Sequence, residues 1–207
     1  MCGRYTITLE PAEIEAEMDV TEFPADFKPR YNVVPSQPVA VVRDLASRKV
    51  EWMKWGLIPF WAKDPAIGAR LFNARSETLA EKPSFKQSFA HRRCLILADG
   101  FFEWQKVPGD ASIPYYLRLK SLQPFAFAGL WDLWTSPENE EVLSCTIITC
   151  SPNELVSPIH DRMPVMLDNK KAWQWLQPAA VEDLEKQLIP YPASEMEAYR
   201  IGREVNN

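Results

Sequence analysis

Five strand-like segments follow one another in the middle of this sequence and constrain its fold more than any other feature. Most are rich in β-branched or aromatic residues, and turn signals such as Pro108-Gly109-Asp110 separate them. The expected strands cover residues 94–98, 101–106, 114–120, 124–134 and 142–150. Because short turns join strands that run in opposite directions, this order favours an antiparallel sheet that is curled into a barrel.

Shorter elements are expected on either side of this sheet. Eighteen prolines against seven glycines predict short elements with stiff connections, and not a bundle of long helices. Helices are expected at residues 11–18, 83–91, 169–177 and 180–188, and further strands at 38–44, 49–57, 71–75 and 199–205. No repeat or flexible linker interrupts the chain. We therefore expect an α+β fold, a mainly antiparallel, barrel-like sheet with peripheral helices, in a single domain over residues 1–207.

The charge distribution gives a weak indication of a binding partner. The net charge is −5, yet residues 43–93 hold eleven Lys or Arg against five Asp or Glu. Such a basic patch could bind a phosphate backbone, although charge alone favours an ordinary solvated surface. No stretch has the length and hydrophobicity of a membrane span, and no signal peptide is recognised. We expect a cytoplasmic protein.

Four cysteines are present, and Cys2 differs from the others. Cys94, Cys145 and Cys150 lie in apolar runs and are expected to be inert core residues. Their spacings match no zinc pattern, so no metal and no cofactor are expected. If Met1 is removed, Cys2 carries an α-amine and a thiol with ordinary pKa values of about 7.7–8.0 and about 8.5. An aldehyde could then form an imine and close to a thiazolidine. Taken alone, a chance cysteine after Met1 is the better interpretation.

Two segments contain residues suited to proton transfer. His160 lies in His-Asp-Arg-Met-Pro, and it is either a catalytic group or a satisfied, partly buried histidine. Glu103 lies among aromatics in Phe-Phe-Glu-Trp. Burial would raise the pKa of its carboxyl and make it a candidate acid or base, whereas strand alternation could equally place it in solvent. His91 is expected to be structural or on the surface.

Two further segments could contact a polyanionic ligand. Asn73 and Arg75 offer an amide and a phosphate-matching guanidinium, or belong to a simple capping turn. Phe60 and Trp61 stand in a proline-stiffened loop beside basic residues, where they could stack on unpaired bases. Core packing is the expected fate of Trp55 in the same region.

Six short motifs occur in a particular order: MCGRY, YNVVP, WGLIPFWAKD, NARSET, FFEW and HDRMP. This combination resembles the SRAP family, named for SOS-response-associated peptidase. The resemblance runs from Cys2 to at least Leu167, and residues 203–207 look like the closing Val-Asn motif of that family. The chain ends sooner after this motif than the resemblance leads us to expect, which leaves C-terminal DNA contacts undecided.

The resemblance implies a sensor of abasic sites in single-stranded DNA that forms a covalent DNA–protein crosslink and protects the lesion. Cys2 would be the nucleophile, and Asn73 would position the N-terminus and the sugar. His160 would donate a proton to the ring oxygen as the sugar opens, and Glu103 would accept the proton of the attacking amine. Phosphates would be bound by Arg4, Arg75 and Arg162, and the flanking DNA held open by Phe60 and Trp61.

The remaining expectations concern activity and partners. A monomer without metal or membrane attachment is expected, associated with the nucleoid when it binds DNA. Weak lyase activity and removal of its own Met1 are compatible with the same chemistry. Two alternatives stay open: an N-terminal-nucleophile cysteine peptidase that uses Cys2, and a non-catalytic binder of single-stranded nucleic acid for which Cys2 is irrelevant.

Overall fold

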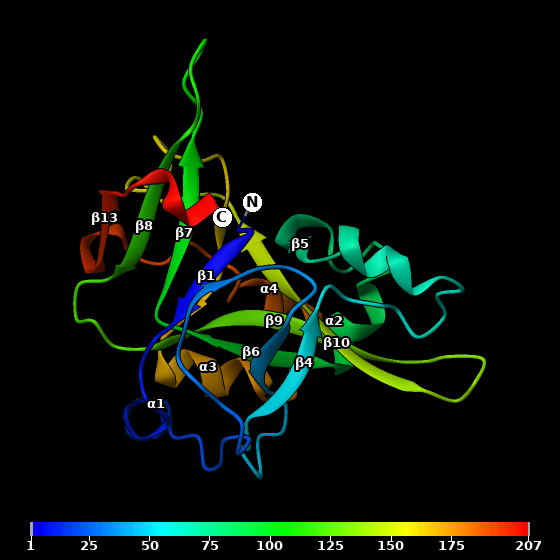
Figure 1. Cartoon of the computed structure of the whole chain (residues 1–207). Helices are drawn as coiled ribbons and strands as arrows, with labels where there is room; N and C mark the ends of the chain where they lie inside the picture. The colour runs from blue at the N-terminus through cyan, green and yellow to red at the C-terminus, as the bar shows by residue number, and fades with distance from the viewer. Residues whose placement is uncertain (1, 207) are drawn as a thin grey trace.

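A closed five-stranded barrel forms the centre of the computed structural model, which describes residues 2–206 (Figure 1). Its strands, in order around the barrel, are β10 (Glu141–Cys150), β4 (Glu51–Trp55), β3 (Pro38–Val42), β6 (Arg93–Ala98) and β9 (Phe125–Thr135). β9 pairs with β10 and closes the barrel. All pairings in this circuit are antiparallel except that of β10 with β4.

Three short strands extend the barrel sheet at one end. They are β5 (Asn73–Arg75) and β11 (Met163–Pro164), which both pair with β10, and β12 (Met166–Leu167), which pairs with β9. β5 runs parallel to β10, with Asn73 opposite Ile147. Residues on either side of the long strand β10 are thereby brought from distant parts of the sequence to one end of the barrel.

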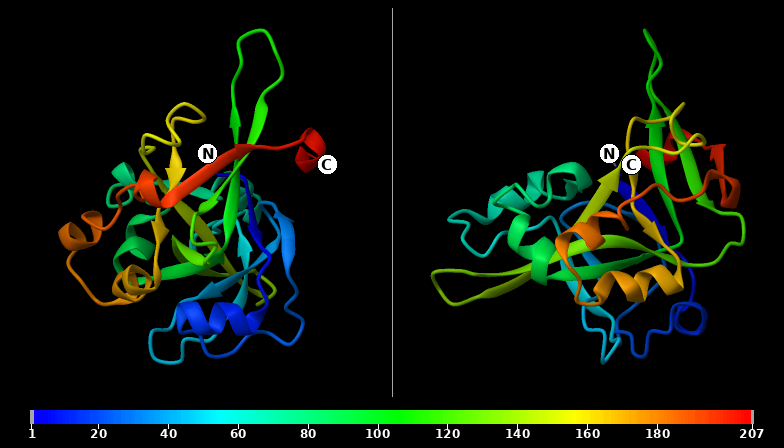
Figure 2. Two further views of the ribbon diagram at one scale, coloured as in Figure 1. Left: turned by 90° about the vertical axis from the view of Figure 1, so that its left-hand side faces the viewer. Right: turned by 180° about the vertical axis from the view of Figure 1, so that it is seen from behind.

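A second, five-stranded antiparallel sheet lies beside this end. Its order is β13 (Met196–Arg200), β8 (Ile113–Leu119), β7 (Gly100–Gln105), β1 (Arg4–Ile7) and β2 (Arg30–Val33). β7 and β8 form a hairpin whose tip projects from the body of the molecule (Figure 2). Only Asp99 separates β7 from β6, so the chain passes directly from the barrel into this sheet.

The helices are peripheral, as the sequence predicts. They are α1 (Pro11–Met18), α2 (Lys86–His91), α3 (Asn169–Leu176) and α4 (Val181–Glu185), with short 3-10 turns η1 (Pro65–Arg70), η2 (Ser76–Thr78), η3 (Ala193–Glu195) and η4 (Arg203–Asn206). α3 packs on β6 and β9, where the Trp175 indole donates to the Cys94 carbonyl at 3.2 Å. No helix within the described range is long and apolar enough to cross a membrane.

Aromatic side chains join the two sheets. The ring of Tyr5 on β1 lies edge-on to Trp55 on β4 and to Phe127 on β9, with centroid separations of 5.3 and 5.6 Å. Phe101 on β7 also contacts Phe127, at 6.1 Å. Each such pair adds about 0.5–1.5 kcal/mol beyond its buried area. β1 is thus fixed against the barrel, and the position of the residues that precede it is fixed as well.

The α+β fold and its barrel are confirmed, and the expected strands between residues 94 and 150 match the observed ones to within about a residue. The strand expected at residues 199–205 is wrong for most of its length, because the observed strand covers Met196–Arg200 and shares only residues 199 and 200 with it. β13 ends at Arg200, and the 3-10 turn η4 follows. There the Val205 and Asn206 carbonyls turn inward and accept hydrogen bonds from Asn32 and Arg4, which a continuing strand could not allow.

Asp99 joins β1 to the junction between the two sheets. Its carboxylate is buried and accepts hydrogen bonds from the Thr6 hydroxyl, from the Thr8 amide and hydroxyl, and from the Leu9 amide. We predict that Asp99→Ala lowers the free energy of unfolding by about 3 kcal/mol, because several buried donors lose their acceptor together. Urea unfolding measures this change. Asp44→Ala, which removes an exposed turn acceptor, should leave the unfolding midpoint nearly unchanged; equal effects would contradict the prediction.

Candidate active site

The site is built around Cys2, which lies two positions before the start of β1. Arg4 lies opposite Phe102 in the antiparallel pairing of β1 with β7, so this register carries the start of the chain past Glu103. The Asn73 side-chain amide donates to the Cys2 carbonyl at 2.7 Å. Asn73 comes from β5 on the other side of the site. The Cys2 main chain is therefore held between two strands that belong to different sheets.

Glu103 is a buried carboxyl in the middle of β7. Its exposed fraction is 2%, so strand alternation points it inward and not to solvent. Burial disfavours the charged carboxylate and raises the pKa of Glu103 to about 7. At neutral pH this group is therefore close to half protonated and can either donate or accept a proton.

His160 faces Glu103 from the loop between β10 and β11. Its Nε2 lies 3.9 Å from Glu103 Oε2. Two Arg162 backbone groups lie beside Nδ1: the N–H, at 3.0 Å, donates to it when the ring proton is on Nε2, and the carbonyl oxygen, at 3.3 Å, accepts from it when the proton is on Nδ1. Asp161 Oδ1 also lies 3.0 Å from Nδ1, a contact that is favourable when this nitrogen carries a proton. Burial lowers the pKa of His160 and keeps the ring mainly neutral near pH 7.

The Cys2 thiol is as buried as the other three thiols, so burial does not distinguish it. Burial and the nearby Glu103 carboxylate raise the pKa of Cys2, and burial raises those of Cys94, Cys145 and Cys150. What distinguishes Cys2 is the set of polar groups around it. The expected removal of Met1 concerns a residue outside those described.

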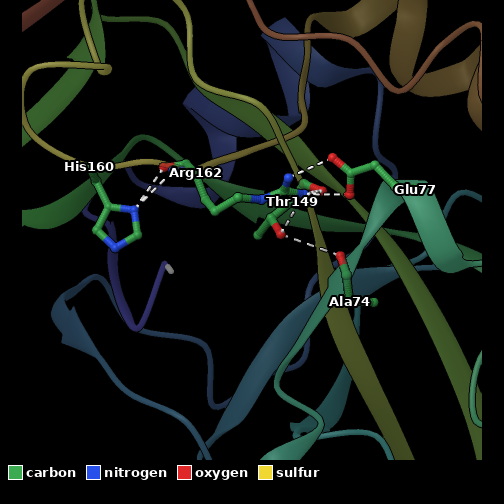
Figure 3. A network of polar contacts seen from close by, with 5 residues as sticks. All are labelled: Ala74, Glu77, Thr149, His160 and Arg162. Atoms are coloured by element: carbon green, nitrogen blue, oxygen red, sulfur yellow. Dashed lines mark hydrogen bonds and ion pairs between the residues drawn. The ribbon is translucent and has the colours of Figure 1, made fainter.

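The three arginines expected to bind phosphates have different surroundings. The Arg75 side chain is exposed. Arg4, two positions after Cys2, donates to Asn32 Oδ1 at 3.0 Å and to the Asn206 carbonyl at 3.1 Å. Arg162 is the least accessible, with 12% of its side chain exposed. Its guanidinium forms a two-point ion pair with Glu77, at 2.5 and 2.9 Å (Figure 3).

Phe60 and Trp61 are half exposed, as their expected role requires, with exposed fractions of 49% and 47%. Their loop leaves the barrel after β4 and returns at β5. Within the loop, the backbone at Gly56 passes close to that at Gly68. Gly56 has a φ of 136°, and a Cβ there would lie 2.6 Å from the Gly68 carbonyl oxygen, so only glycine fits. The Phe60 amide donates to Asp132 at 3.0 Å. Trp55 is buried in the core, as expected.

The structure brings Cys2, Asn73, Glu103 and His160 together, whereas Phe60 and Trp61 stand on a separate loop. Sequence reasoning missed three polar residues that support the site: Asn32, Glu77 and Asn206. All three lie in motifs that the sequence does single out. The sequence gives no indication of their partners, which are distant along the chain. Asn32 pairs with Arg4, Glu77 with Arg162, and Asn206 with Trp104.

Comparison with known proteins places this chain in a family. A model of the SOS response associated peptidase (SRAP) family matches residues 1–207. The chain belongs to the SRAP family. It is 43% identical to the abasic site processing protein YoqW of Bacillus subtilis (strain 168), over 100% of this chain and 95% of that protein. It is 29% identical to the abasic site processing protein HMCES of Xenopus tropicalis, over 100% of this chain and 75% of that one.

The SRAP fold is also found among solved structures. A protein from Bacteroides thetaiotaomicron superposes with a TM-score of 0.91 at 28% identity, over 98% of this chain and 93% of that one. The match extends through both sheets, because it covers nearly the whole chain. The arrangement of β1, β5 and β7 around residue 2 is therefore part of a fold that is shared across distant sequences.

The raised pKa of Glu103 predicts a stability difference that depends on pH. Because the pKa is near 4.5 in the unfolded chain and about 7 in the folded protein, Glu103 favours folding at acid pH, and this contribution is lost as the pH rises from about 4.5 through about 7. Relative to Glu103→Gln, the wild-type free energy of unfolding should fall by about 3 kcal/mol between pH 4 and pH 8. Urea unfolding of both proteins across this range measures it. If the difference in free energy of unfolding between the two proteins did not change with pH, the pKa of Glu103 would not be raised in the folded protein.

Proposed function

We propose that this protein recognises abasic sites in single-stranded DNA and bonds to them covalently through residue 2 after removal of Met1. The observation that carries the proposal is the placement of Cys2 between Asn73, Glu103 and His160. Similarity to proteins named for abasic site processing supports it. In this proposal the protein acts as a monomer and is associated with the nucleoid while it is bound to DNA.

The proposed reaction joins an aldehyde to an aminothiol. An abasic deoxyribose opens from its hemiacetal to an aldehyde at C1′. The free Cys2 amine adds to C1′ and forms a carbinolamine, which loses water to give an imine. The thiol then adds to the imine carbon, and its proton passes to the nitrogen, which leaves a five-membered thiazolidine. One water molecule is released, and no oxidant, reductant or metal is consumed.

The two neighbouring groups would manage the protons of these steps. The Nε2–H of His160 is suited to donate to the ring oxygen as the sugar opens. Glu103, with its pKa about 7, is suited to accept the proton of the attacking amine and to return one to the departing water. Because burial keeps the Cys2 thiol protonated, amine attack comes first and ring closure second.

Asn73 is proposed to hold the Cys2 carbonyl so that the amine and thiol both face the sugar. Arg4, Arg75 and Arg162 are proposed to bind phosphates around the lesion. An imine intermediate also allows strand cleavage by β-elimination, so weak lyase activity is part of the proposal. Self-removal of Met1 at the same site would account for the word peptidase in the family name.

We predict that Cys2→Ala abolishes the complex with abasic single-stranded DNA that survives denaturation. Cys2→Ala and Cys2→Ser both keep the α-amine but cannot form the thiazolidine, so each should give only an imine that borohydride can trap. Denaturing gels and intact-protein mass spectrometry measure both outcomes, and the mass also reports whether Met1 is removed. Cys150→Ala is the matched control, since Cys150 is also buried but lies on β10.

Two results would contradict this proposal and favour its rivals. Undiminished crosslinking by Cys2→Ala would exclude the Cys2 thiol from the stable adduct. Wild-type protein that retains Met1 and binds DNA only reversibly would indicate a non-catalytic binder. Efficient hydrolysis of unrelated peptides, lost in Cys2→Ala, would indicate a cysteine peptidase.

The aromatic loop gives a separate prediction about DNA affinity. Trp61→Ala should weaken binding to intact and abasic single strands alike, by about 1–3 kcal/mol per stacked base lost, while the crosslinking rate at saturating protein stays close to wild type. Fluorescence anisotropy and single-turnover gels separate these effects. Leu122→Ala is the control, because Leu122 is also exposed (54%) but lies in the β8–β9 turn beside α1. Unchanged affinity of Trp61→Ala would exclude the loop from DNA binding.

A further inference from the structure

Glu77 is a charged residue that the proposed function does not use, although it is tied to the site. It lies in η2, the turn that directly follows β5. Its two carboxylate oxygens accept from the two terminal nitrogens of Arg162 at 2.5 and 2.9 Å. This hydrogen bonding lowers the pKa of Glu77, so its carboxylate stays ionised. The pairing is a two-point contact between a largely buried guanidinium and a carboxylate whose side chain is 49% exposed.

Arg162 is in turn anchored to the barrel. One terminal nitrogen also donates to the Thr149 carbonyl of β10 at 2.6 Å (Figure 3). Only 12% of the Arg162 side chain is exposed, so the guanidinium would be a poorly solvated cation without its carboxylate partner. Glu77 and Thr149 together therefore decide where the Arg162 side chain lies.

The Arg162 main chain bears directly on His160. Its N–H lies 3.0 Å and its carbonyl oxygen 3.3 Å from His160 Nδ1, so the N–H is the nearer of the two groups (Figure 3). Nε2, the other ring nitrogen, lies 3.9 Å from Glu103 Oε2. The loop is fixed before this point by the His160 amide, which donates to the Val156 carbonyl at 2.9 Å. It is fixed afterwards by Met163, which pairs with Cys150. The Arg162 peptide between them is held through its own side chain.

We propose that Glu77 is a positioning residue for His160: through Arg162 it fixes the backbone N–H that binds His160 Nδ1, and so keeps the ring proton on Nε2 facing Glu103. The catalytic meaning of this device rests on the proposed function. Asn73, which holds Cys2, lies only four residues before Glu77. One short segment thus aligns the nucleophile through Asn73 and the proton donor through Glu77.

The isosteric variant Glu77→Gln tests this proposal, since it removes the charge and keeps the shape. The chain has only two histidines, so the ring nitrogens of His160 are readily assigned by ¹⁵N NMR against His91→Gln. In wild-type protein His160 should show one neutral tautomer, with the proton on Nε2. In Glu77→Gln the two tautomers should both be populated, and Glu77→Asp should restore the wild-type spectrum in part. This measurement needs no DNA.

Kinetics provide the second readout. At saturating protein, the single-turnover crosslinking rate of Glu77→Gln with an abasic oligonucleotide should fall by about tenfold, within the range that misplacement of a catalytic group costs. Its affinity for an oligonucleotide with an unreactive tetrahydrofuran abasic analogue should stay within about twofold of wild type. Glu51→Gln is the matched control, because Glu51 makes a similar two-point pair with Arg43 on the barrel and should change neither readout.

The outcomes separate this inference from its rivals. An unchanged tautomer in Glu77→Gln overturns it. Tighter DNA binding with an undiminished rate also overturns it, and indicates that Glu77 merely occupies Arg162 until a phosphate arrives. If wild-type protein forms no crosslink but the tautomer shifts as expected, the positioning device stands and the proposed function fails. If Glu77→Gln lowers the melting temperature, Glu77→Asp carries the test, with an intermediate rate expected.

Discussion

The antiparallel pairing of β1 with β7 holds the start of the chain against a buried carboxyl. This pairing is reinforced from three directions: β2 hydrogen-bonds to the other edge of β1, Tyr5 packs into the barrel between Trp55 and Phe127, and Asp99 accepts from the turn after β1. A terminal residue ordinarily has many conformations. Here the loss of that freedom is compensated during folding, by burial and hydrogen bonds, before any ligand arrives.

The same burial shapes the chemistry of the site. Removal of water raises the pKa of Glu103 to about 7 and lowers that of His160 below its ordinary 6.5. Burial therefore reverses the order found in water, where an imidazole holds its proton more tightly than a carboxyl group does. The strand that positions Glu103 and the loop that positions His160 therefore also set the pKa values of these two groups.

The sequence predicts the barrel well because its strands alternate with clear turn signals, and β6 to β10 are each pinned by local residue patterns. It also predicts the buried state of Glu103 as one of two alternatives. It fails where long-range partners decide the outcome. Nothing local to the C-terminal segment reveals that Asn32 and Arg4 bind the carbonyls of residues 205 and 206, and nothing in NARSET reveals that Glu77 faces Arg162. Such pairs join positions that are distant along the chain, and local patterns carry no information about them.

The η4 turn places the last described residues beside the start of β1. The Asn206 carbonyl accepts from Arg4, its side chain accepts from the Trp104 indole, and the Val205 carbonyl accepts from Asn32 (Figure 1). A purification tag or fluorescent protein fused after residue 207 would thus stand beside residue 2, just as one fused at the start would block the amine. The β9–β10 turn around residues 136–140, at the far end of the barrel hairpin, is the better position for a label.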